Sequence, residues 1–172
     1  PTRRSSDLAL QHDPRSMEVV AASACGVVLM HSPSSGDDCH EGGAYVDVVT
    51  DVFDALDARI AACTAAGIGR DRIMVDPGIG FGKSLADNLA ILNRLALYQA
   101  LGVPVLLGVS RKRMIGALDN EAAVDQRLGG SVALHLIAAT QGAQLLRVHD
   151  IAETRQALRL WRGLRDSALI AI

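Results

Sequence analysis

Aromatic residues, cysteines and long apolar runs are all scarce in this sequence of 172 residues. Aromatics make up only 3% of the chain, although 49% of it is hydrophobic, so the core must be built from Ala, Val, Leu and Ile. That composition suits helices packed on buried parallel strands. No apolar run approaches the ~20 residues that a bilayer-spanning helix needs. We therefore expect no membrane partner.

The chain also lacks an excess of either charge. Lys and Arg number 17 and Asp and Glu 19, for a net charge of −2, which argues against a nucleic-acid partner. The three cysteines, Cys25, Cys39 and Cys63, form no C-x-x-C pair and are typical of reduced thiols in a cytoplasmic protein. His31, Cys39 and His40 lack a fourth ligand at a suitable spacing, so we predict no metal site from them.

Residues 1–7 (PTRRSSD) differ in character from the rest and resemble a translated sequencing adapter. We predict that residues 1–7 are a non-native segment and that residues 8–172 form the fold. The segment is polar and no apolar stretch follows it, so we expect no signal peptide.

Apolar runs and helical periodicities alternate along the remaining chain. Four short apolar runs have the character of strands buried on both faces: residues 27–30, 73–75, 103–109 and 145–148. Five segments have helical periodicity: residues 14–24, 45–66, 85–100, 127–141 and 151–166. Residues 32–43 and 111–126 are expected to be loops, the second with a helical turn or two. In the last helix we predict that Ile151, Leu158 and Trp161 face inward.

This order of elements predicts an α/β fold with parallel strands. Strands that are each followed by a helix are compatible with an open doubly wound sheet or with part of a (β/α)₈ TIM-type barrel. A complete barrel takes ~250 residues, so about four βα units would form one half of it.

Polar residues gather where the predicted strands end. Asp76, Lys112, Arg147 and His149 each follow a strand, and the C-terminal ends of parallel strands share one edge, so we expect these four side chains to converge. Arg147 and His149 alternate along a strand end and face one side together, where they and Lys112 would suit a phosphate group. A structural ion pair between Arg147 and Asp150 is the alternative.

Several residues at these strand ends could have a purely structural role instead. Asp76 precedes Pro-Gly and could be a simple turn residue, and residues 110–113 could be a solvated basic turn. The glycines of residues 78–84 (GIGFGKS) match neither the P-loop nor the G-x-G-x-x-G pattern, although they permit close backbone approach to a ligand. His135 lies within an apolar helix and reads as a core residue.

Three long motifs, in the right order, resemble those of dihydropteroate synthases. They are residues 76–83 (DPGIGFGK) followed by Asn88, residues 104–116 (PVLLGVSRKRMIG), and residues 127–131 (RLGGS) leading to 147–150 (RVHD). Residues 29–31 (LMH) match a further short motif. The resemblance runs from about residue 8 to 166. It implies that residues 8–172 are the C-terminal half of a (β/α)₈ TIM-type barrel.

The resemblance also implies a reaction. In that family p-aminobenzoate displaces pyrophosphate from 7,8-dihydropterin-6-ylmethyl pyrophosphate, a transferase step of folate biosynthesis and a target of sulfonamides. By match to the motifs, Asp76 would accept the N–H donors of the pterin, Lys112 would contact both substrates, and Arg147 and His149 would hold the pyrophosphate. These four residues would be catalytic.

Four more residues would complete the substrate site by the same match: Met30, Gly80, Phe81 and Ser110. Met30 would pack on the pterin ring and Phe81 against p-aminobenzoate. Mg²⁺ is implied as a cofactor, but its main protein ligand would belong to the other half of the barrel, so no metal ligand is predicted here. The family resemblance further implies a homodimer.

Two alternatives remain open at this stage. A pterin-binding methyltransferase that acts on methyltetrahydrofolate shares the barrel, although it would have no pyrophosphate for the motifs at 110–112 and 147–150 to hold. An inactive fragment is the other, because a half barrel exposes strand edges and apolar surface and should associate or fold poorly.

Overall fold

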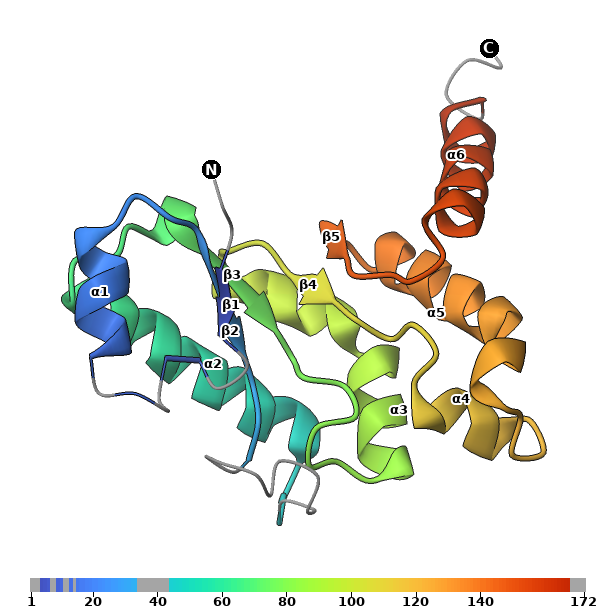
Figure 1. The fold of residues 1–172 in the computed structure, drawn as a ribbon, viewed down its shortest axis with the longest axis horizontal. Helices are drawn as coiled ribbons and strands as arrows, with labels where there is room; N and C mark the ends of the chain where they lie inside the picture. Colours follow the sequence, from blue (N-terminus) through green and yellow to red (C-terminus); the bar gives the residue numbers. More distant parts are fainter. Residues whose placement is uncertain (1–3, 7–8, 11–12, 14, 34–43, 168–172) are drawn as a thin grey trace.

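Five parallel strands, β1 to β5, form the centre of the molecule (Figure 1). The computed structural model describes residues 4–6, 9–10, 13, 15–33 and 44–167. Its strands are β1 (Arg4–Ser6), β2 (Val27–Met30), β3 (Ile73–Asp76), β4 (Leu106–Leu107) and β5 (Leu145–Leu146). β1, β2 and β3 pair in that order, β4 pairs with β5, and a parallel bridge between Val75 and Val105 joins the two groups. Each strand therefore lies beside the one that precedes it in sequence.

Helices connect these strands. The α-helices are α1 (Ser16–Ala22), α2 (Val48–Ala65), α3 (Leu85–Asn93), α4 (Arg113–Leu118), α5 (Leu128–Thr140) and α6 (Ile151–Ser167). Short 3₁₀ helices are η1 (Arg70–Arg72), η2 (Leu95–Leu101) and η3 (Val124–Gln126). α2 packs on β2 and α3, and α5 packs on α6. No helix in the described ranges is long and apolar enough to cross a bilayer.

The core explains why the first strands and α2 form where they do. All four residues of β2 are buried, and the register places Leu29 beside Val75 and Met30 beside Asp76. α2 begins directly after Asp47, its N-cap residue, whose carboxylate accepts hydrogen bonds from the backbone N–H groups of Val49 and Thr50. The helix buries one face made of Val48, Val49, Val52, Leu56, Ile60 and Cys63. That face covers the sheet.

The structure departs from the sequence predictions at several elements. β1 falls within the segment that the sequence analysis set aside, so it was not predicted; whether residues 1–7 are native stays a hypothesis. The helix predicted over 85–100 is interrupted at Arg94 and continues as η2. α2 begins later than predicted. Residues 34–43 of the predicted loop lie outside the described residues.

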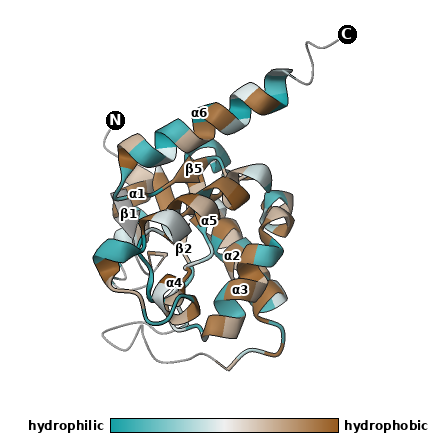
Figure 2. Cartoon of the chain, turned by 90° about the vertical axis from the view of Figure 1, so that its right-hand side faces the viewer, coloured by the Kyte–Doolittle hydropathy of each residue, from teal (hydrophilic) through white to brown (hydrophobic). Residues whose placement is uncertain are grey.

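The prediction for α6 was wrong at Ile151. Its side chain is 67% exposed, whereas Leu158 and Trp161 are partly buried. α6 packs on α5 and projects from the body of the molecule, and Thr154 is its one buried residue (Figure 1). Figure 2 shows apolar and polar residues alternating along this helix. Leu160 and Leu164, each 66% exposed, add to its uncovered apolar surface.

Candidate functional site

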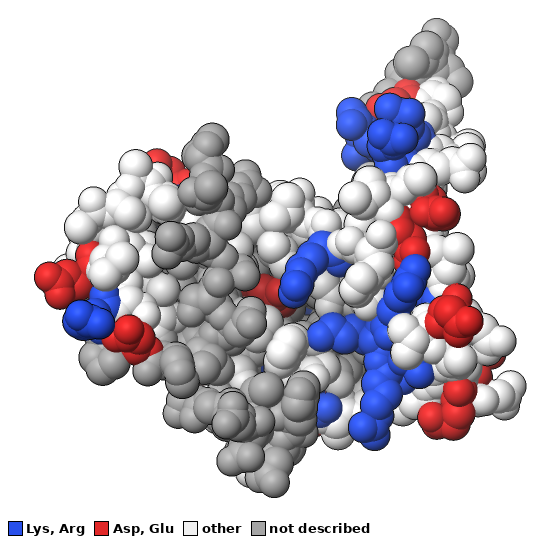
Figure 3. All heavy atoms as spheres, viewed as in Figure 1, with Lys and Arg blue, Asp and Glu red and all other residues white. Residues whose placement is uncertain are grey.

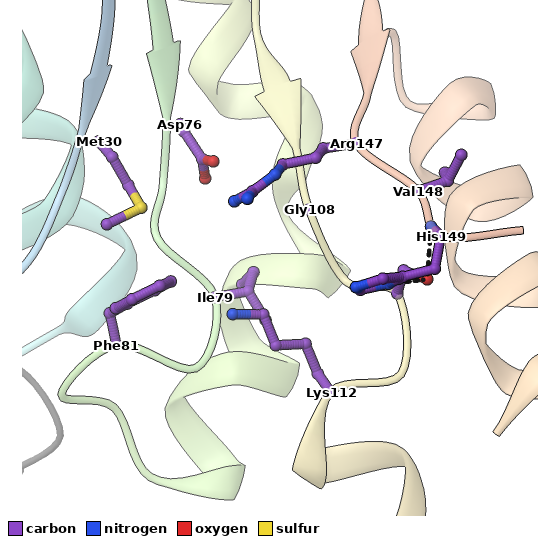
Figure 4. Close-up of a pocket in the computed structure, with 10 residues that line it drawn as sticks. Met30, Asp76, Ile79, Phe81, Gly108, Lys112, Arg147, Val148 and His149 are labelled. Atoms are coloured by element: carbon purple, nitrogen blue, oxygen red, sulfur yellow. Dashed lines mark hydrogen bonds between the residues drawn. The ribbon is translucent and has the colours of Figure 1, made fainter. Parts of the chain in front are cut away.

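The ends of β2, β3, β4 and β5 open on a cavity of about 310 Å³ (Figure 4). The strands are parallel, so their C-terminal ends share this edge and the residues that follow them meet there. The cavity is lined by Met30, Asp76, Ile79, Phe81, Gly108, Ser110, Lys112, Arg147, Val148 and His149. Of the eight residues predicted for the site, all but Gly80 line this cavity. Lys and Arg side chains gather on the same side of the molecule (Figure 3).

Asp76 is the last residue of β3 and the acidic group of the cavity. Its side chain is 8% exposed, and its Oδ1 accepts a hydrogen bond of 2.8 Å from the backbone N–H of Gly78. Burial raises the pKa of this carboxyl to about 6, although the Gly78 N–H and the cations of Lys112, Lys83 and Arg147 oppose the rise. Asp76 is therefore mostly ionised at pH 7. Figure 4 shows its carboxylate pointing toward the Arg147 guanidinium.

The turn that follows Asp76 requires glycine at two positions. Gly78 and Gly80 have φ values of +69° and +79°, in the left-handed region. A Cβ at Gly78 would overlap the carbonyl oxygen of His31, and a Cβ at Gly80 would lie 3.3 Å from Cδ of Lys112. Gly80 thus lies behind Lys112 and lines a second cavity, of about 590 Å³, next to Arg113.

Lys112 and Phe81 form one wall of the site. Lys112 is the N-cap residue of α4, and its Nζ lies 4.2 Å from the centroid of the Phe81 ring, in the range of a cation–π contact. Met30, at the end of β2, lies on the other side of the cavity from Lys112 (Figure 4). The cavity therefore has an apolar sulfur and an aromatic ring next to its charged groups.

Arg147 and His149, from the segment after β5, line another part of the cavity. The backbone N–H of Arg147 donates to the carbonyl of Leu107 at 2.9 Å, which fixes the segment after β5 against β4. His149 Nδ1 lies 2.9 Å from Ser110 Oγ, which also accepts from the His149 backbone N–H at 3.2 Å. His149 therefore contacts Ser110 through Nδ1, and Nε2 is the ring nitrogen on the other side.

Asp150 binds Arg111 rather than Arg147, so the structural ion pair considered for Arg147 is not formed. The Arg111 guanidinium reaches both oxygens of Asp150, at 3.1 Å from Nε and 2.5 Å from Nη2. This bidentate hydrogen bond holds the pKa of the Asp150 carboxyl below its usual value. Arg111 itself has φ +56°, and its N–H donates to Ser131 Oγ.

Sequence reasoning missed two residues that support the site. Arg111 ties the segment after β4 to the segment after β5, and Lys83 binds inside the glycine turn at 77–82. Both belong to the motifs, but their partners, Asp150 and His31, are distant in sequence and no pattern pairs them. His135, expected in the core, is fully buried and its Nδ1 lies 2.7 Å from the Ser131 carbonyl.

The residues that line the cavity do not form a metal-binding group. Within the described ranges, no three His, Cys, Asp or Glu side chains are grouped so that they could hold one. Asp76 is surrounded by the cations of Lys112, Lys83 and Arg147, which suits an anionic or donor-rich ligand better than Mg²⁺. Cys39 and His40 lie outside the described residues.

Comparisons with known proteins agree with this geometry. Residues 6–149 match the family described as pterin binding enzyme. The chain is 40% identical over 155 residues to the dihydropteroate synthase of Escherichia coli strain K12, a match that covers 90% of this chain and 55% of that protein.

Solved structures of such enzymes superpose on the model. The Xanthomonas albilineans dihydropteroate synthase in complex with 7,8-dihydropteroate matches with a TM-score of 0.87 and 46% identity over 94% of this chain and 60% of that one. The same enzyme with 4-aminobenzoic acid matches with a TM-score of 0.87 and 47% identity over 94% of this chain and 56% of that one. This chain thus spans between 55% and 60% of the length of these relatives. It has their α/β fold, and it belongs to the pterin-binding enzyme family.

Proposed function

We propose that this chain is the C-terminal half of the (β/α)₈ TIM-type barrel of a dihydropteroate synthase. Five parallel strands in consecutive order, with the site at their C-terminal ends, support a barrel segment. The coverage of relatives, at between 55% and 60% of their length, supports a half. The observation that carries the proposal is the buried, ionised Asp76 between Met30 on one side and Lys112 and Arg147 on the other.

Asp76 is suited to bind a pterin. The pterin ring presents an amino group and a ring N–H side by side, and a buried carboxylate can accept both in a bidentate arrangement. Met30 supplies a polarizable surface for the flat ring. Asp76 is largely removed from water. A ligand that donates hydrogen bonds to its carboxylate oxygens therefore supplies partners that water cannot.

Arg147, His149 and Ser110 are suited to hold a pyrophosphate. Arg147 offers a planar fork of N–H donors that matches phosphate oxygens. His149 contacts Ser110 through Nδ1, which leaves Nε2 available to face the same anion. The two side chains extend from one strand end toward the cavity that Asp76 closes at the other side (Figure 4).

The proposed reaction follows from these placements. As the C–O bond to pyrophosphate breaks, positive charge develops on the pterin methylene and negative charge on the leaving oxygen. Arg147 and His149 stabilise that oxygen, and the Lys112–Phe81 wall holds p-aminobenzoate so that its amine attacks in line. A C–N bond forms, the amine gives up a proton to the solvent, and no covalent enzyme intermediate is needed.

Two parts of the family chemistry rest on residues beyond those described. Mg²⁺ would accompany the pyrophosphate, but the described residues supply no magnesium site, so no step is assigned to it. A homodimer is proposed from the family resemblance. A methyltransferase is the weaker candidate, because the anion side formed by Arg147 and His149 would then have no substrate group to hold.

Calorimetric titration with the pterin pyrophosphate tests the proposal. We expect the chain to bind it and Lys112→Ala to bind at least about tenfold more weakly, since a hydrogen bond to a charged group contributes roughly 1.5–3 kcal/mol. Arg94→Ala is the matched control, because Arg94 pairs with Asp47 on the surface at 3.4 Å and lies outside the cavity. A folded chain that does not bind, or equal binding by Lys112→Ala, would contradict the proposal.

A further inference from the structure

Lys83 is a largely buried lysine whose ammonium lies within the glycine turn beside the cavity. The sequence contains only two lysines, Lys83 and Lys112, and both lie at the candidate site. Lys112 lines the cavity, whereas Lys83 points its ammonium into the turn formed by residues 77–82. Nothing in the proposed reaction uses Lys83, so its placement needs another explanation.

The Lys83 ammonium makes three hydrogen bonds, two of them inside this turn and one to His31. Its Nζ donates to the carbonyls of Gly78 at 2.9 Å and Phe81 at 3.0 Å, and lies 3.0 Å from His31 Nδ1. The three N–H donors of the ammonium thus have three acceptors within hydrogen-bond distance. A guanidinium has its donors in one plane and could not replace it.

His31 is the part of this arrangement that lies outside the turn. It follows Met30 directly at the end of β2, and its backbone N–H donates to the carbonyl of Asp76 at 2.9 Å. Burial, and then the charge of Lys83, lower the pKa of His31 to about 4, so its ring is neutral and Nδ1 can accept. Burial lowers the pKa of Lys83 to about 8, so this side chain is still mostly protonated at pH 7.

The rest of the turn is held from the other side. The amide oxygen of Asn88 in α3 accepts from Gly80 N–H at 2.7 Å, and its amide nitrogen donates to the carbonyls of Lys83 and Ser84. The Tyr45 hydroxyl donates to the carbonyl of Gly82 at 3.3 Å. Phe81, at the tip, has its backbone carbonyl bound to Lys83 and its ring facing Lys112.

We propose that Lys83 and His31 are a positioning pair that fixes Phe81, and with it the amine-side wall of the cavity, against the end of β2. The pair joins the residue after Met30 to the carbonyl of Phe81, whose side chain lies on the same side of the cavity as Met30 and faces Lys112 (Figure 4). The position of Phe81 relative to the end of β2 is thereby set before any ligand enters. The assignment of Phe81 to the amine substrate rests on the proposed function, but the positioning itself is a property of the free chain.

The test uses the two phenylalanines of the chain. With 4-fluorophenylalanine incorporated, Phe81 and Phe53 each give a fluorine resonance, and Phe53 in α2 serves as the internal reference. We expect Lys83→Met and Lys83→Arg to move the Phe81 resonance and leave that of Phe53 in place. His31→Leu should do the same, whereas His31→Gln, which keeps an acceptor, should restore much of the original spectrum. Arg94→Met is the surface control.

A second readout measures how firmly the turn is held. Amide hydrogen exchange at Phe81 should become at least about fivefold faster in Lys83→Met, because the variant loses all three hydrogen bonds of the ammonium and each contributes about 1 kcal/mol. An unchanged Phe81 resonance in both Lys83→Met and His31→Leu would overturn the proposal, as would equal shifts of Phe53 and Phe81. Both readouts are taken without ligand, so a failure of the wild-type chain to bind pterin would count against the proposed function alone.

Discussion

Asp76 shows how one residue can close a turn and line a cavity at the same time. One carboxylate oxygen closes the turn by accepting from Gly78, as a turn residue would, while the side chain also faces the cations of the cavity. The two readings of Asp76 that the sequence left open are therefore compatible. The cost of this arrangement is a charge held out of water, which raises the pKa of the carboxyl to about 6.

Replacing Asp76 by Asn should stabilise the fold and weaken the binding of pterin. Because the folded-state pKa is raised, the stability that Asp76 allows is fully present below about pH 4 and is lost as the pH rises through about 6. We expect Asp76→Asn to be more stable than wild type at pH 7 by on the order of 2–3 kcal/mol. Urea unfolding at pH 7 and pH 4 measures this. A gain that persists at pH 4 would contradict the explanation.

His31 should show the opposite dependence on pH. Its pKa is lowered from 6.5 to about 4, so the stability linked to its neutral ring is present above about pH 6.5 and is lost as the pH falls through 4. Relative to wild type, His31→Gln should therefore gain stability on acidification from pH 7 to pH 4, while Asp76→Asn loses its advantage. Thermal unfolding of both variants across this range is the measurement. Parallel curves for the two variants would be inconsistent with these pKa directions.

At the scale of elements, α3 is anchored by a capping box at its start. The Ser84 hydroxyl accepts from the Asp87 N–H at 3.1 Å, and the Asp87 carboxylate accepts from the Ser84 N–H at 2.9 Å. The same first turn presents Asn88 to the glycine turn. The first turn of α3 therefore stabilises the helix through its capping box and holds the glycine turn of the site through Asn88.

Loss of this cap should have a moderate cost. We expect Ser84→Ala to lower the free energy of unfolding by about 1 kcal/mol, the usual value for an N-cap. Ser84→Thr, which retains the hydroxyl, should lose much less. The urea midpoint of each variant gives the comparison. Equal losses in both would mean that the hydroxyl is not what matters at this position.

The sequence predicted best those elements whose signal is local. β2 and β3 are continuous apolar runs, and the parallel order follows from alternation with helices. The strand-end rule also named Asp76, Lys112, Arg147 and His149, which the cavity contains. The pairings of Lys83 with His31 and of Arg111 with Asp150 could not be predicted, because each joins separate units whose distance only the folded chain determines. Exposure of Ile151 likewise depends on what lies beside α6.

At the scale of the whole molecule, α6 carries part of the uncovered apolar surface. Ile151, Leu160 and Leu164 are each between 66% and 67% exposed, and within the described sheet β1 and β5 each have one unpaired edge. Such surfaces favour association. We expect sedimentation analysis to find association that grows with protein concentration.

Substitutions can assign that association to α6. Leu160→Glu combined with Leu164→Glu should shift the chain toward monomer, whereas Leu118→Glu, at a leucine of α4 that is 60% exposed, should not. A wild-type chain that remains monomeric and melts cooperatively at all concentrations would contradict this prediction. It would also weaken the view that the chain is an inactive fragment.

The consecutive order of the strands has a consequence for when the site can exist. Each strand pairs with its predecessor, so a chain emerging from the ribosome can add β2, β3 and β4 as they appear. The turn at Asp76 can form early, because its partners are nearby in sequence or in β2. Arg147 and His149 arrive only with β5, the last strand to pair. The anion side of the proposed site is therefore completed last among the described strands, so the affinity of the chain for an anion would report on the pairing of β5 with β4.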